Sequence, residues 1–371
     1  MAGSLVEAAV NRRSQIFSRR IAFCEVVKPS DITSRLEFTR ADVPVEGVTR
    51  SLLASISRSD WFSIEGGRIY IEVRNLFAFS HDSMDKLRVI KGVDFDDCLA
   101  SATRWHRKEQ ELMEQHFGIP LHSGKALYEA SKIMVPGKAV GEKRYTPRLN
   151  LALLTAYRDL IERRVPEGTA LDEATEWAKD VAELVKSRGE IAIARQVVDP
   201  QISEVFYNNR ISRFLYQDFA GAVFNTKSPA ALGFIATRGK IEGSLGQVYK
   251  IHTSGVLKRS NVDMVIYTND IKAETLLHLS NLLPGHIKKK AFYLFDDNVA
   301  EIVPYLETAD SHGMSNVWVV QVCHPDAKRK NDKVDLEPVR IVGRPSNGGP
   351  VLNYFTTERN IHSSYGNLFF V

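Results

Sequence analysis

The sequence predicts an α/β fold: a Rossmann-like parallel sheet, an inserted all-helical domain and a small α+β appendage at the N-terminus. Two observations support it. From about 262 to 323, short apolar runs alternate with helical patterns, as in parallel sheets with right-handed crossovers. Between a similar apolar run at 89–93 and that region, most of 121–228 carries apolar residues at helical spacing, which indicates a helical insert.

The N-terminal segment contains a predicted β-hairpin. Trp61–Glu65 and Arg68–Val73 flank the turn residues Gly66 and Gly67. With a helix at about 49–57, this pattern fits either a winged-helix-like DNA-binding module or an α+β appendage that covers a sheet edge. We favour the appendage, residues 1–85, because the accompanying positive charge is modest.

Composition limits the class of protein. The 371 residues suggest two to three domains, and the net charge of +4 is too small to argue for nucleic acid. Three cysteines, far apart and odd in number, fit a reducing compartment and a cytoplasmic protein. No apolar run approaches the roughly 20 residues of a membrane span. The arginine-rich first 23 residues fit a surface helix better than an organellar presequence.

The strongest chemical signal follows the apolar run at 89–93. Asp94, Asp96 and Asp97 come directly after it, and alternate strand residues point the same way, so Asp94 and Asp96 can share one small volume. Clustered carboxylates at a strand end require a cation or solvent, and hard oxygen ligands suit Mg²⁺. One carboxylate could attack phosphorus while the other moves a proton. The alternative is a solvated turn in which Asp97 caps the next helix.

Two later strands are predicted to end in polar groups as well. Val262–Thr268 is followed by Asn269, and Ala291–Phe295 is followed by Asp296 and Asp297. Because the carboxyl ends of parallel strands lie at one edge of a sheet, we expect the three tips to meet in one site.

A glycine-rich stretch, Gly233–Gly255, is interpreted as a loop that returns from the insert. Within it, Thr237–Lys240 could touch a phosphate, but the loop interpretation is preferred. Thr253 is a second choice to Thr268 as a phosphate-binding hydroxyl.

The order of these motifs resembles the haloacid dehalogenase-like (HAD) phosphatase superfamily. The resemblance covers about residues 87–118 and 256–323, and the helical insert resembles the cap that many members place over the site. It implies a core of residues 86–118 and 245–371 with a helical cap at 119–244.

The resemblance also implies roles. Asp94 would be the nucleophile that forms an aspartyl-phosphate, and Asp96 the general acid/base. Thr268, with Asn269 beside it, would bind the transferring phosphoryl group. Asp296 and Asp297 would hold Mg²⁺ together with Asp94 and the backbone carbonyl of Asp96.

The lysine of the family pattern is harder to place. Lys288, Lys289 and Lys290 lie just before the third strand, and Lys272 follows the second. We favour Lys289, with Lys272 as the alternative.

The leading hypothesis is therefore a Mg²⁺-dependent phosphohydrolase that acts on a small phosphorylated metabolite or a nucleotide. Two alternatives stay open: a regulatory binding protein on the same scaffold, and a phosphatase that processes nucleic-acid ends. We expect no membrane partner, and the oligomeric state is left open.

Overall fold

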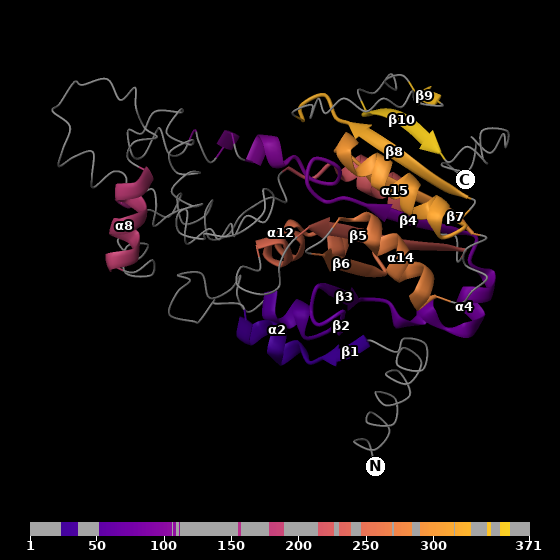
Figure 1. Ribbon diagram of the computed structural model, residues 1–371, viewed down its shortest axis with the longest axis horizontal. Coiled ribbons are helices and arrows are strands. Elements are labelled where there is room, and N and C mark those ends of the chain that lie inside the picture. Colours follow the sequence, from indigo (N-terminus) through magenta and orange to yellow (C-terminus); the bar gives the residue numbers. More distant parts are fainter. Residues whose placement is uncertain are drawn as a thin grey trace, which may run out of the picture.

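The computed structural model describes most of an α/β core and part of the predicted insert (Figure 1). The described residues are 24–35, 52–105, 107, 108, 111, 155, 156, 178–188, 214–225, 230–238, 246–268, 271–283, 290–314, 316–327, 340–342 and 349–356. Among their helices, none is long and apolar enough to cross a bilayer.

Ten strands of the described residues form one sheet, in the order β1-β2-β3-β6-β5-β4-β7-β8-β10-β9. The strands are β1 (Cys24–Val27), β2 (Asp60–Ile64), β3 (Ile69–Val73), β4 (Val89–Val93), β5 (Ala231–Arg238), β6 (Met264–Thr268), β7 (Ala291–Asp296), β8 (Val317–Cys323), β9 (Arg340–Val342) and β10 (Val351–Thr356).

The five central strands, β6-β5-β4-β7-β8, are all parallel. This confirms the predicted α/β class and the parallel core. Antiparallel strands extend the sheet on both sides, with β3 next to β6 and β10 next to β8. Strand β4, which leads into the acidic turn, lies in the middle of this array.

Helices cover both faces of the sheet. The main described helices are α2 (Pro29–Arg35), the 3₁₀ turn η1 (Leu76–Phe79), α4 (His81–Lys86), α8 (Ala178–Arg188), α11 (Gln217–Phe224), α12 (Gly246–Ser254), α13 (Val256–Arg259), α14 (Ala273–Leu282) and α15 (Val299–Ser311). Residues 52–56 and 102–105 are helical as well. One buried apolar cluster joins the sheet to α2, α11, α12 and α13. A second joins the other face to η1, α4, α14 and α15. The site edge is thus bordered by α12 on one face and α14 on the other.

Strand β5 corrects the sequence analysis. Residues 231–238 form a central strand between β4 and β6, whereas a loop was expected there. Gly233 favoured the loop prediction, but in the structure this glycine allows close packing inside the sheet. A Cβ at this position would lie 2.8 Å from Cδ1 of Phe224. The boundary of the proposed insert at residue 244 is therefore wrong, since β5 belongs to the core. Most of 119–230 lies outside the described residues, and α8 and α11 are the helices described within it.

The N-terminal hairpin is confirmed, with β2 and β3 paired from Asp60↔Val73 to Ile64↔Ile69. It is part of the main sheet, because β3 pairs with β6 along its whole length. This agrees with the interpretation that the segment covers a sheet edge, and it makes 52–85 continuous with the core.

Candidate active site

Two neighbouring strands deliver the acidic residues to one place. Val93 of β4 pairs with Phe295 of β7. The residue that follows each of them in the sequence, Asp94 or Asp296, therefore lies beside the other at the edge of the sheet. The backbone N–H of Asp94 donates to the carbonyl of Phe295 at 2.8 Å, which keeps the turn against β7 after β4 ends.

Asp94, Asp296 and Asp297 form a buried carboxylate cluster. One oxygen from each lies within 4.8 Å of the others. Lys272 sits between two of them, with Nζ 2.9 Å from Oδ1 of Asp94 and 2.8 Å from Oδ2 of Asp296. The second oxygen of Asp296 accepts from the backbone N–H of Asn298 at 2.9 Å. The structure therefore brings together the first and third predicted strand tips and one predicted lysine.

Burial controls the protonation of this cluster. It raises the pKa of Asp94 to about 7, and the neighbouring carboxylates add to that effect while Lys272 opposes it. Burial likewise raises the pKa of Asp296. For Lys272, burial alone would lower the pKa, but Asp296 and Asp94 outweigh it, and the pKa lies well above its usual value. Lys272 is therefore a permanent cation at this place.

The donor set fits a hard divalent cation. Three carboxylates share one ammonium group, so with all three ionised the cluster carries an excess of about two negative charges, which burial makes costly. Carboxylate oxygens are the ligands that Mg²⁺ takes in proteins. Asp94, Asp296 and Asp297 are thus the residues that could hold it.

Asp96 faces a different element. Its carboxylate accepts from Lys250 Nζ at 3.0 and 3.1 Å and from Gln247 Nε2 at 2.8 Å, both on α12. Asp97 has a φ of 58° and its Oδ1 accepts from the N–H of Thr103 at 3.1 Å. Asp97 thus binds the first turn of the helix that begins at residue 102, but it is buried and is not the N-cap. Ser101 holds that position, because its Oγ accepts from the N–H of Arg104, so the alternative of a solvated turn capped by Asp97 is wrong.

The threonine on the second tip stands apart. Thr268 is fully buried at the end of β6, paired with Arg238 of β5 and Ile69 of β3, so β5 separates it from β4. Thr237, near the end of β5, lies on the strand next to β4. From the sequence alone, Thr237 is a possible phosphate contact and Thr268 the preferred hydroxyl, because residues 231–238 are interpreted there as a loop and not as a strand. An apolar run, 232–236, that ends in Thr237 was the signal available.

The lysines separate as well. Lys288 and Lys289, the latter our first choice, lie outside the described residues, as does Asn269. Lys290 is half-buried just before β7 and, within the described part of the chain, forms no ion pair with the carboxylate cluster. Lys272, the alternative, occupies the position between Asp94 and Asp296.

Comparisons with known proteins give structural matches only. No family model matches the sequence, and no curated protein matches it. A haloacid dehalogenase-like hydrolase from Burkholderia xenovorans has 12% identity and a TM-score of 0.37, over 63% of this chain and 81% of that one. A haloacid dehalogenase-like family hydrolase from Xanthomonas campestris has 14% identity and a TM-score of 0.31, over 66% and 84%.

The chain is thus similar in structure to hydrolases of the superfamily that its motifs resemble.

Proposed function

We propose that this protein is a Mg²⁺-dependent phosphohydrolase that uses Asp94 as nucleophile on a small phosphorylated metabolite or nucleotide. One observation carries the proposal: Asp94 is buried at the tip of a central parallel strand, among two further carboxylates and a lysine that contacts it at 2.9 Å. A structural ion pair would need neither the excess carboxylates nor the position at the carboxyl edge of the sheet.

The chain's own groups divide the work. When bound, Mg²⁺ would offset the charge of the carboxylates and of a phosphate dianion. Asp94 attacks the phosphorus atom, the ester bond breaks, and the phosphoryl group moves to the carboxylate as an aspartyl-phosphate. Lys272 contributes a fixed positive charge beside the attacking oxygen and restricts the rotamer of Asp94. Water then attacks the phosphorus atom, releases phosphate and restores Asp94.

Asp96 is the proposed general acid and base, two residues beyond the nucleophile. It would protonate the leaving oxygen and later take a proton from water. For the hydroxyl that binds the phosphoryl group we now propose Thr237 in place of Thr268, because β5, which carries Thr237, is the direct neighbour of β4.

The test is hydrolysis of p-nitrophenyl phosphate with and without Mg²⁺. We expect turnover that depends on Mg²⁺ and falls at least about 10³-fold in Asp94→Asn, since a neutral amide is not a nucleophile at this centre. Asp218→Asn, the same change at an exposed position of α11, is the matched control and should keep full activity.

Turnover that survives in Asp94→Asn would contradict the proposal, and so would turnover that persists after chelation of divalent ions. Mg²⁺ binding without hydrolysis of any phosphate ester in a broad panel would favour the alternative of a binding protein on this scaffold.

A further inference from the structure

A second buried cation lies beside Asp96, outside the carboxylate cluster. The side chain of Lys250 is 10% exposed, and its Nζ contacts both oxygens of Asp96. The ammonium group also lies 5.3 Å from the ring centroid of Trp105, a cation–π distance. A lysine that only needed solvation would extend into water, so this one is held at the site by its surroundings.

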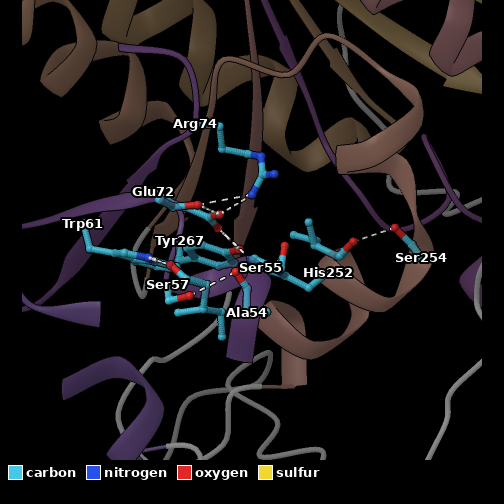
Figure 2. A network of polar contacts seen from close by, with 12 residues as sticks. Ala54, Ser55, Ser57, Trp61, Glu72, Arg74, His252, Ser254 and Tyr267 are labelled. Atoms are coloured by element: carbon cyan, nitrogen blue, oxygen red, sulfur yellow. Dashed lines mark hydrogen bonds and ion pairs between the residues drawn. The ribbon is translucent and has the colours of Figure 1, made fainter. Parts of the chain in front are cut away.

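Helix α12, which carries Lys250, is itself anchored to the core through other side chains. Val248 and Ile251 are buried in the apolar core, and His252 Nε2 lies 2.8 Å from Oε2 of Glu72 on β3 (Figure 2). Nδ1 of His252 lies 3.2 Å from the hydroxyl of Ser55. These contacts fix the helix independently of Asp96, so the cation is preorganised.

The pair of side chains on α12 has hydrogen-bonding capacity beyond Asp96. Lysine has three N–H donors, and the two contacts to Asp96 use two of them. The Oε1 atom of Gln247 is buried and has no hydrogen-bond partner among the described residues, while its Nε2 donates to Asp96. A buried acceptor without a partner is costly, which favours a ligand that supplies a donor there.

We propose that Lys250 and Gln247 form the subsite for the leaving group and select phosphate esters whose leaving group carries a carboxylate or a similar anion. This rests on the proposed function, because it takes Asp96 as the acid that protonates the leaving oxygen. The side chains around Asp96 then also surround the leaving group. Lys250 binds the anionic group of the leaving group, and Gln247 Oε1 accepts a hydrogen bond from a hydroxyl of the leaving group.

The geometry sets the reach. The ester oxygen lies within about 3 Å of Asp96 for proton transfer. Lys250 Nζ is 3.0 Å from Asp96 Oδ1, and a bound anion lies within about 3 Å of the ammonium group. The anion is therefore at most about 9 Å from the ester oxygen, which a carboxylate on a small acid or a benzene ring satisfies.

The test compares two substrates of nearly equal shape, 4-carboxyphenyl phosphate and 4-carbamoylphenyl phosphate. We expect kcat/KM to be about tenfold higher for the charged substrate, the size of one charge-assisted hydrogen bond. Lys250→Met keeps the apolar stem and should bring the ratio to about one, while Lys250→Arg keeps most of it. Removing Lys250 also removes its contacts to Asp96, which could lower the activity on both substrates. The ratio of the two kcat/KM values cancels that common loss.

Lys258→Met, which removes an exposed lysine on α13, is the matched control and should leave the ratio unchanged. Gln247→Glu is the second variant, for use if Lys250→Met does not fold. It adds a negative charge beside Lys250 and should lower the ratio of the two kcat/KM values. Hydrolysis of both substrates at equal kcat/KM by the wild type would overturn the subsite and leave the proposed function standing. An unchanged ratio in Lys250→Met would also overturn it. Absence of hydrolysis of either substrate would overturn both.

Discussion

At the scale of single residues, Lys272 is the cation that offsets the charge of the buried carboxylate cluster. It is buried and contacts two buried carboxylates at 2.9 and 2.8 Å. Lys272→Met leaves three carboxylates with no cation, so we expect a loss of about 3–5 kcal/mol in the free energy of unfolding in buffer without Mg²⁺. Urea denaturation measures it, and added Mg²⁺ should restore part of the loss.

Lys290→Met is the control for that prediction. The side chain is half-buried and lies outside the carboxylate cluster, so the change should stay within about 0.5 kcal/mol. Equal losses for the two variants would show that the cluster does not depend on Lys272.

The same residues show what the sequence could predict about the site. Asp94 and Asp296 were predictable because each follows an apolar strand directly, and β4 and β7 are neighbours. Lys272 was not distinguishable from Lys289, because a lysine side chain is long and its target depends on where the chain turns after β6. Thr237 was passed over since its strand was not recognised.

At the scale of elements, β5 depends on a close fit with β4. Gly92 pairs with Phe234, and a Cβ on Gly92 would lie 2.7 Å from Cε2 of that ring. Gly92→Ala should therefore cost about 2–3 kcal/mol by overpacking. Phe234→Leu should cost about 1 kcal/mol alone and relieve part of the first loss, so the double variant is more stable than the sum of the single changes predicts.

Urea denaturation of the four proteins gives the coupling energy. Strictly additive losses would mean that β5 does not lie against β4 in this register. The register itself explains why sequence analysis missed the strand. Glycines at 92 and 233 make room for Phe234 and Phe224, and in the sequence alone the same glycines indicate loops.

The hairpin β2–β3 and helix α12 are joined by one buried charge. Glu72 accepts from Ser59, Arg74 and Tyr267 and lies 2.8 Å from His252 (Figure 2). Burial would raise the pKa of Glu72, but His252, Arg74 and Ser59 together lower it to about 2. The stabilisation is thus fully present above the unfolded pKa of about 4.3 and is lost as the pH falls towards 2.

We expect this carboxylate to contribute about 3 kcal/mol near neutral pH. Glu72→Gln should remove most of it and flatten the dependence of stability on pH between about 4.3 and 2, measured by chemical denaturation at a series of pH values. Glu65→Gln, in the exposed turn between β2 and β3, is the matched control. A variant at Glu72 with the same acid-induced loss as the wild type would assign that loss to other carboxylates.

At the scale of the whole molecule, one sheet joins segments that are far apart in the chain. The carboxylate cluster takes side chains from the residue after β4 and from the end of β7, and its lysine precedes α14, so these separate segments must come together before the site exists. Antiparallel strands from the N-terminal and C-terminal parts extend the parallel core on both sides. Formation of the site therefore requires the central sheet as a unit.

Ligand binding at such a site stabilises the fold as a whole. A cation that binds only the folded protein adds about 2.7 kcal/mol at a concentration one hundred times its dissociation constant. We expect Mg²⁺ to raise the thermal midpoint of unfolding at constant ionic strength, and we expect Asp297→Asn to lose most of that rise. Asp263→Asn is the control and should keep it, because Asp263 is a buried aspartate at the ends of β5 and β6 that lie away from the carboxylate cluster. Because burial raises the pKa of Asp94 to about 7, protons compete with the metal, and the rise should be larger at pH 8 than at pH 6. Differential scanning calorimetry checks each comparison, and an equal rise in wild type and Asp297→Asn would place the bound cation elsewhere.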